Sequence, residues 1–400
     1  MKARVRWLRV IDMNNTKQLD STYIANTYAR FPLNLVKGKG SLVWDENGKE
    51  YIDLSTGIAV NTFGIADEEW AAAVTAQLGT LQHMSNLYYT NPCAKLAQTL
   101  CERTGMKKVF FSNSGAEANE CAIKVARKYA ADKKGKEYYH IITLENSFHG
   151  RTITTLAATG QAVFHEDFTP LTEGFLYAKA NDFTAIKALT EQYKCAAIMM
   201  EVVQGEGGVM PLEQEFVSAV AKLAAEQDIL LITDEVQVGN GRSGKLYGYM
   251  NYDVQPDIVS TAKGLAGGLP LGATLLGEKV QDTLTPGSHG STFGGNPVCC
   301  AAALNVLSRL DEDLLAGVRE RSALIFDTLK DAKGVVGVSG LGLMVGIKTE
   351  KDAGEIIRRC MECGVLVIKA KDKVRLLPAL NIPIETLAKA LGILKEICAE

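Results

Sequence analysis

The chain lacks the features that mark several large classes of protein. Its 400 residues include only five histidines, and none has a spacing such as HxxxH that would bind a metal ion. No uninterrupted apolar run approaches the roughly 18–20 residues that a membrane helix requires. The net charge is only −3, which does not indicate a surface for nucleic acid or anionic membranes. The Gly-x-Ser-x-Gly turn of many serine hydrolases is absent as well.

The nine cysteines form no pattern of a disulfide framework or a zinc site. They are odd in number and scattered through apolar segments, which favours reduced thiols in a cytoplasmic protein. The CxxC at Cys360–Cys363 has neither a second pair nor a histidine nearby, so we interpret it as part of a helix.

The first residues differ in composition from the rest of the chain. Met1–Ile11 carries four basic side chains and no acidic one, and it lacks the apolar core of a secretory signal. We expect residues 1–20 to form a disordered extension; translation that truly starts at Met13 would account for the same segment.

The middle of the chain alternates short β-branched apolar runs with helical patterns. Overall composition is that of a large globular protein, with 47% hydrophobic and 22% charged residues. Buried strands are expected at Val109–Phe111, His140–Thr143, Ala196–Met200, Ile229–Ile232, Asp257–Val259 and Ala273–Leu276, with helices such as Ala116–Ala131, Thr184–Tyr193 and Glu215–Gln227 between several of them. This pattern predicts an α/β fold with a mostly parallel sheet covered on both faces.

The pattern changes after about Leu307 and predicts a second, smaller domain. Helices there flank short strands at Val335–Val338, Leu343–Ile347, Val365–Ile368 and Val374–Leu377. We expect residues 306–400 to form an α+β domain that residues 21–63 join, with paired strands around Gly40–Leu54. Residues 64–305 would form the large domain.

A lysine and an aspartate stand at the ends of two predicted strands. Asp234 follows Ile229–Thr233, and Lys263 follows Ile258–Ala262 and begins a glycine-rich turn. This pair fits a pyridoxal phosphate site, where the lysine amine attaches the cofactor and the acid keeps the pyridine nitrogen protonated. Burial beside a cationic ring would lower the pKa of Lys263 and make it able to shuttle protons. An ordinary arginine could equally be the partner of Asp234.

Other strand ends carry polar or aromatic residues suited to the same site. Ser114 opens a helix whose N-terminus could bind a phosphate, although Ser114-x-x-Glu117 is also a simple capping box. Phe148 could stack on a cofactor ring, and Arg151 could pair with a substrate carboxylate, or the segment could be a turn with a solvated arginine. Two further acids, Glu201 and Glu235, end predicted buried strands.

One glycine-rich segment has the form of a nucleotide-binding motif. Gly239–Gly244 matches GxGxxG, and with Lys245 it nearly matches a P-loop. Both motifs must open a helix, and Lys245–Tyr252 has no helical apolar stripe, so we do not expect nucleotide binding.

Taken together, these segments resemble the class III (ω-type) pyridoxal phosphate aminotransferases. The resemblance runs from about Thr22 to the C-terminus, and the segments that carry it are Tyr28–Pro32, Gly57–Asn61, Ser85–Tyr89, Asn113–Asn119, Asn146–Thr152, Gln204–Gly208, Asp234–Gln237, Ala262–Gly264 and His289–Pro297. It implies a fold-type I transferase with a large, mostly parallel sheet domain and a smaller α+β domain.

The resemblance and the strand ends together give the cofactor-binding candidates. The resemblance implies that Lys263 and Asp234 are catalytic, that Phe148 and Val236 cover the two ring faces, and that Gln237 lies near the phenolic oxygen. Gly115 and Ala116 would hold the phosphate together with Thr292 of the neighbouring subunit, which implies a homodimer with its active site at the interface. The full set is Ser114, Gly115, Ala116, Phe148, Glu201, Asp234, Glu235, Val236, Gln237, Lys263 and Thr292.

The substrate-binding candidates follow from the same resemblance: Tyr28, Ile58, Arg151, Glu206, Ser291 and Arg375. Arg151 would bind a substrate carboxylate, and Arg375 would bind the α-carboxylate of glutamate. Glu206 would mask Arg375 when the other donor binds, because that donor reacts at its terminal amine and keeps its carboxylate farther away. An amino-acid racemase of this fold would not need such a pair.

The expected reaction is transfer of the δ-amino group of N-acetylornithine to 2-oxoglutarate, as in arginine biosynthesis. Ile58 favours an acylated donor, since members that act on ornithine resemble this chain but place an aromatic residue there. Succinylornithine, N-succinyl-diaminopimelate, ornithine and 4-aminobutyrate remain alternative donors.

Overall fold

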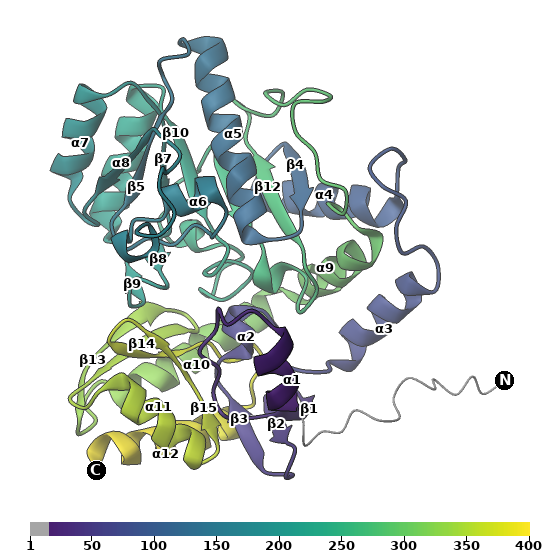
Figure 1. The fold of residues 1–400 in the computed structure, drawn as a ribbon, viewed down its shortest axis with the longest axis vertical. Coiled ribbons are helices and arrows are strands. Elements are labelled where there is room, and N and C mark those ends of the chain that lie inside the picture. The colour runs from purple at the N-terminus through teal and green to yellow at the C-terminus, as the bar shows by residue number, and fades with distance from the viewer. Residues whose placement is uncertain (1–15) are drawn as a thin grey trace.

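The computed structural model describes residues 16–400, which form an upper and a lower region in Figure 1. Residues 1–15 of the expected extension lie outside the described residues. Residues 16–20 do not fit that expectation, because they belong to helix α1 (Thr16–Tyr23), whose hydroxyls of Ser21 and Thr22 donate back to the carbonyl of Gln18.

A seven-stranded sheet forms the centre of the upper region. Its order is β4 (Lys108–Ser112), β12 (Gly272–Leu276), β11 (Ile258–Thr261), β10 (Leu230–Asp234), β7 (Cys195–Met200), β5 (His140–Leu144) and β6 (Phe175–Ala178). Only β12 runs antiparallel to its neighbours, so the prediction of a mostly parallel sheet is confirmed. The edge strand β6 was not predicted; its four residues are apolar, but only Ala178 is fully buried.

Helices cover both faces of this sheet, as the continuous apolar strands require. Neighbouring residues point to opposite faces: Ile141 packs in the cluster formed with helix α5 (Gly115–Lys133), and Ile142 packs in the cluster that includes helix α8 (Gln214–Glu226). Helix α7 (Phe183–Gln192) lies beside α8. Helices α3 (Glu68–Leu78), α4 (Asn91–Thr104) and α9 (Pro297–Arg309) pack together at the other side of the region (Figure 1).

The lower region contains two four-stranded sheets and three long helices. One sheet has the order β13 (Val335–Leu341), β14 (Met344–Thr349), β17 (Lys373–Leu376) and β16 (Ile368–Ala370). The other has the order β1 (Leu35–Lys39), β2 (Leu42–Asp45), β3 (Glu50–Asp53) and β15 (Val365–Leu366). The helices are α10 (Glu312–Leu329), α11 (Ala353–Glu362) and α12 (Ile384–Ala399).

The predicted strand at Val365–Ile368 is in fact two strands in two sheets. β15 pairs with β3 in parallel, whereas β16 pairs with β17 in the antiparallel sheet. Because β15 joins the N-terminal strands to the C-terminal part, we propose that residues 21–63 and 306–400 form one domain and residues 64–305 the other.

The Gly239–Gly244 segment lies at the contact between the two regions. As predicted, it opens no α-helix: turns and a single 3-10 turn, η4 (Gly248–Asn251), follow it. Arg242 is buried there and donates to the carbonyls of Leu343 and Pro378 at 2.9 Å each. Among residues 16–400, no helix is both long and apolar enough to cross a bilayer.

Candidate active site

A cavity of about 500 Å³ opens at the carboxyl edge of the large sheet. It is lined by residues that follow β4, β5, β7, β10 and β11, together with the turn before β12. Ten of the predicted site residues line it: Ser114, Gly115, Ala116, Phe148, Arg151, Glu201, Asp234, Val236, Gln237 and Lys263. Parallel strands end at the same edge, and ligands of open α/β sheets bind there.

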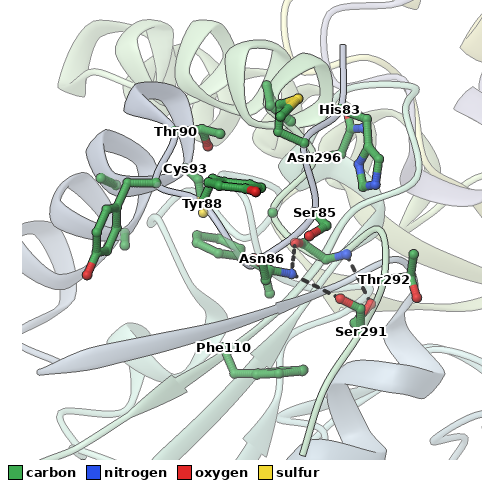
Figure 2. Close-up of a pocket in the computed structure, with 18 of the residues that line it drawn as sticks. His83, Ser85, Asn86, Tyr88, Thr90, Cys93, Phe110, Ser291, Thr292 and Asn296 are labelled. Atoms are coloured by element: carbon green, nitrogen blue, oxygen red, sulfur yellow. Dashed lines mark hydrogen bonds between the residues drawn. The ribbon is translucent and has the colours of Figure 1, made fainter. Parts of the chain in front are cut away.

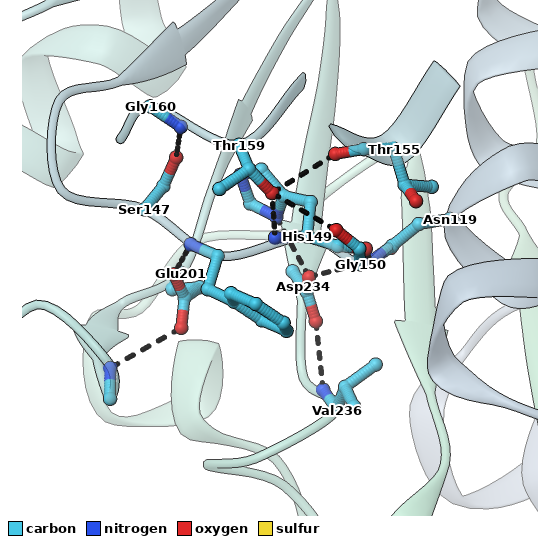
Figure 3. Close-up of polar contacts among 12 residues, drawn as sticks. Asn119, Ser147, His149, Gly150, Thr155, Thr159, Gly160, Glu201, Asp234 and Val236 are labelled. Atoms are coloured by element: carbon cyan, nitrogen blue, oxygen red, sulfur yellow. Dashed lines mark hydrogen bonds and ion pairs between the residues drawn. The ribbon is translucent and has the colours of Figure 1, made fainter. Parts of the chain in front are cut away.

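Asp234, at the end of β10, is held by three donors. Its Oδ1 accepts the backbone N–H of Val236 at 3.0 Å, and its Oδ2 accepts the side-chain amide of Asn119 at 2.7 Å (Figure 3). His149 Nδ1 lies 2.8 Å from the same Oδ2, while the buried Nε2 of His149 has no partner in residues 16–400. The carboxylate is therefore fixed in place without a lysine or arginine within ion-pair distance among those residues.

Sequence reasoning gave no role to His149 and Asn119. His149 directly follows Phe148, and Asn119 lies on the first turns of α5, so both were inside segments that the resemblance had marked. Nothing in their spacing from Asp234 indicated contact, because Asn119 lies 115 positions and His149 lies 85 positions before it along the chain.

Lys263 lies at the end of β11 and has a backbone φ of +46°. A non-glycine residue in this left-handed region is uncommon, and such residues cluster at functional sites. Burial lowers the pKa of its amine, against the opposing effect of Glu206, Asp234 and Glu201, and Arg375 lowers it further. A larger fraction of neutral amine makes Lys263 a better nucleophile and proton acceptor.

The N-terminus of α5 combines a cap with an open anion site. Ser114 Oγ accepts the N–H of Glu117 at 3.2 Å, as the capping reading predicted. The carboxylate of Glu117 turns back to Asn113, whose backbone N–H it accepts at 2.6 Å. Gly115 and Ala116 line the cavity at the positive end of the helix. The segment can therefore both cap the helix and bind a phosphate. A Cβ on Gly115 would meet Val236 Cγ1 at 2.6 Å, so only glycine fits there.

The aromatic wall and the nearby arginine lie in the loop after β5. Phe148 lines the cavity, and Phe164 meets it edge-on with ring centroids 6.0 Å apart. The guanidinium of Arg151 lies over the Phe164 ring at 4.0 Å and is exposed, so its donors remain available to a ligand.

These residues fit pyridoxal phosphate. The phosphate would sit at Gly115 and Ala116, the ring between Phe148 and Val236, its nitrogen at Asp234, and its aldehyde carbon toward Lys263. Three observations of the structure support this fit. One cavity is lined by a buried lysine with a lowered pKa and by a buried carboxylate that has no lysine or arginine partner among residues 16–400. It is also lined by Gly115, where a Cβ would not fit.

Arg375, on β17, is buried and crosses between the two regions. Its Nη1 donates to Glu206 Oε1 at 2.6 Å and to Gln237 Oε1 at 2.9 Å. Burial opposes ionisation of Glu206, but the charge and hydrogen bond of Arg375 outweigh it, so the pKa of Glu206 lies below its ordinary value. The predicted Glu206–Arg375 pair is thus formed, and Gln237, expected near the phenolic oxygen, is also bound to it.

Glu235 must be removed from the cofactor-binding set. Its side chain does not line the cavity; Oε2 accepts the N–H of Gly248 at 2.6 Å and Oε1 that of Tyr249 at 2.9 Å. Alternation along a strand explains this, because consecutive side chains point to opposite faces. Asp234 faces the cavity and Glu235 faces the core, where burial raises its pKa to about 7.

Ser291 and Thr292 line a second cavity, of about 540 Å³, rather than the one around Lys263 (Figure 2). Ser291 Oγ accepts from Asn113 at 3.2 Å, and Asn86 donates to the carbonyl of Ser291 at 3.0 Å. Thr292 does not line the lysine cavity of its own chain, and its role toward a neighbouring subunit stays a prediction.

Tyr28 and Ile58 also lie outside the lysine cavity. Tyr28 is 69% exposed and lines a separate pocket in the lower region. Ile58 is 42% exposed and sits in the turn α2 (Thr56–Ala59), whose four residues all have positive φ. Thr56 Oγ1 donates to the carbonyl of Leu377 at 2.6 Å and fixes this costly turn. Their roles toward substrate stay predictions.

Comparison with known proteins decides the family. Residues 23–398 match the aminotransferase class-III family. The chain belongs to this family. It is 51% identical to an acetylornithine aminotransferase of Haemophilus ducreyi, over 96% of this chain and 98% of that protein.

Solved structures of similar proteins agree with the fold. The ornithine aminotransferase of Toxoplasma gondii superposes with a TM-score of 0.93 at 30% identity, covering 98% of this chain and 96% of that one. The N-acetylornithine aminotransferase of Stenotrophomonas maltophilia superposes with a TM-score of 0.83 at 36% identity, covering 96% and 98%. The fold-type I architecture and the pyridoxal phosphate cofactor expected from the sequence are thereby confirmed.

The buried carboxyl of Glu235 predicts a pH dependence of stability. Its pKa rises from an ordinary 4.5 to about 7 on folding. Between these pH values the folded protein binds a proton that the unfolded chain has released, so the contribution of this group to stability falls as pH rises. We expect the thermal stability of Glu235→Gln, relative to that of the parent protein, to increase as the pH rises from 5 to 8.

The measurement is the midpoint of thermal unfolding of cofactor-free protein at several pH values. Glu396→Gln, at an exposed position of α12, is the matched control. A difference between Glu235→Gln and the parent that stays constant with pH would contradict the prediction.

Proposed function

We propose that the protein transfers the δ-amino group of N-acetylornithine to 2-oxoglutarate, giving N-acetylglutamate semialdehyde and glutamate. The observation that carries this proposal is the Glu206–Arg375 pair beside Lys263. Arg375 provides a second binding site for a substrate carboxylate, and Glu206 can cover it. The names of the similar proteins support the acylated donor. We also propose that the enzyme acts in the cytoplasm in arginine biosynthesis; its nine cysteines are all free.

When bound, pyridoxal phosphate supplies a ring that withdraws electrons from the reacting carbon of the substrate. The residues of the chain do the rest. Asp234 offers a fixed negative charge to the pyridine nitrogen, and Asn119 and His149 keep that carboxylate from turning away. Lys263 Nζ would hold the cofactor when no substrate is bound, and once released its free amine would accept a proton from the substrate carbon and give it back, a task that its lowered pKa suits.

Two arginines at different places explain how one pocket serves two substrates. N-Acetylornithine reacts at its terminal amine, so its carboxylate lies far from Lys263, where the exposed Arg151 can bind it. Glutamate reacts at its α-amine and needs a cation close by. Arg375 supplies it when Glu206 turns away, and Glu206 covers it again in the other half-reaction, so the buried cation always has a partner.

A homodimer would complete the site. Thr292 lies in a cavity with exposed large apolar neighbours such as Tyr88 and Tyr89, which a partner subunit would cover. We expect sedimentation equilibrium to give twice the mass of the chain at micromolar concentration. A monomer that retains full activity would contradict the shared site.

The reaction can be followed in the visible spectrum of the purified enzyme. We expect the absorption band of the bound cofactor to fall when N-acetylornithine is added and to return with 2-oxoglutarate. Lys263→Ala, which lacks the amine, should lose turnover by several orders of magnitude. If ornithine bleaches the band and N-acetylornithine does not, ornithine is the amino donor. The similarity to an ornithine aminotransferase keeps this alternative open. No band with added cofactor would overturn the proposal.

The two arginines should be separable by half-reaction. Arg375→Ala should slow the glutamate half-reaction by about a hundredfold, because a charge-assisted contact is worth up to about 3 kcal/mol. The N-acetylornithine half-reaction should change far less. Arg151→Ala should slow both. Single-turnover rates with each amine separate the two halves, and equal losses for both variants would refute this division of roles.

A further inference from the structure

Glu201 is a buried carboxylate for which the proposed reaction has no direct use. It directly follows β7, lines the lysine cavity and is 4% exposed. Its Oε1 accepts the backbone N–H of Phe148 at 2.8 Å, and its Oε2 accepts that of Gly205 at 3.3 Å (Figure 3). Among residues 16–400, no lysine or arginine lies within ion-pair distance of it.

The two amides belong to separate loops, of which the one with Phe148 lines the lysine cavity. Phe148 is the aromatic wall in the loop after β5. Gly205 follows the short strand β8 (Val203–Gln204) and directly precedes Glu206, which covers Arg375. One side chain therefore connects the ring-stacking residue to the loop that carries the partner of the near arginine.

Keeping an acid at this position is costly. Burial raises the pKa of Glu201 to about 7, the positive influence of His149 lowers it only in part, and the charge of Asp234 raises it again. A neutral glutamine of the same size would avoid that cost, but its amide has a single acceptor oxygen. Only a carboxylate presents two acceptor oxygens to two N–H groups on opposite sides.

We propose that Glu201 is a positioning residue that holds Phe148 and the Gly205–Glu206 loop in fixed relation to Lys263. It acts through these two backbone amides and not on the substrate itself. Its effect on catalysis rests on the proposed function, whereas its effect on the two loops does not.

Glu235 offers a matched control for this proposal. It is equally buried, it follows the next strand of the sheet, and it also accepts two backbone N–H groups. It differs in that neither oxygen touches a residue lining the cavity. Glu201→Gln and Glu235→Gln thus remove the same chemical group from comparable surroundings, inside and outside the site.

The experiment compares both variants with the parent protein in three measurements. These are amide hydrogen exchange of the cofactor-free protein, the Kd of pyridoxal phosphate by fluorescence titration, and the KM for glutamate and for N-acetylornithine. For Glu201→Gln we expect faster exchange confined to residues 145–150 and 203–208. We also expect an increase of about tenfold in the cofactor Kd and in the KM for glutamate, since one charged hydrogen bond is lost. The KM for N-acetylornithine should change much less.

Glu235→Gln should alter thermal stability but leave the cofactor Kd and both KM values unchanged. If Glu201→Gln behaves like Glu235→Gln, or like the parent protein, the proposal is overturned. If the parent enzyme itself transfers no amino group, the proposed function fails, and hydrogen exchange in the two loops still decides whether Glu201 holds them.

Discussion

The whole site depends on the direction of four neighbouring strands. β5, β7, β10 and β11 run parallel, so Phe148, Glu201, Asp234 and Lys263 emerge at one edge although 115 residues separate the first from the last. Reversing any one of these strands would carry its terminal residue to the far edge of the sheet. The antiparallel β12 contributes the turn before it, not its end, for the same reason.

Buried acids at this edge are held mostly by backbone N–H groups and neutral side chains. Asp234 accepts from Val236 and Asn119, and Glu201 accepts from two loop amides. Within residues 16–400, Glu206 alone among these three acids has a lysine or arginine within ion-pair distance. Asp234 gives the cavity a negative field, whereas burial raises the pKa of Glu201 to about 7 and weakens its contribution. Such a field favours a protonated pyridine ring, and it leaves the lowered pKa of Lys263 to burial and to Arg375.

The same contacts join the two regions of the molecule. Arg375 reaches Glu206 from β17, Ser339 on β13 donates to the carbonyl of Val209, and Lys373 donates to Met210 Sδ at 3.1 Å. All three bind the hairpin that follows β7. Opening the Glu206–Arg375 pair for glutamate therefore alters a contact between the two regions, while Ser339 and Lys373 keep the hairpin in place.

The sequence alone predicted most strands of the large sheet, several of the helices that cover them, and half of the residues that line the cavity. Apolar runs of strand length and the strand-end positions of Lys263, Asp234 and Ser114 are local signals, so they could be read without the structure. Motif resemblance added the Glu206–Arg375 pair, which no local pattern indicated, because the partners are 169 residues apart.

Only the tertiary structure decided which strand-end side chains face the cavity and which support it. Asp234 and Glu235 are adjacent acids at the end of the same strand, so the sequence does not show which one faces the cavity. Because side chains alternate along β10, Asp234 points to the cavity and Glu235 points to the core. The contacts of His149 and Asn119 with Asp234, and of Glu201 with two loops, needed the folded chain. These contacts join segments that are far apart in sequence. The packing of helix and sheet brings them together, and the number of residues between them does not predict that proximity.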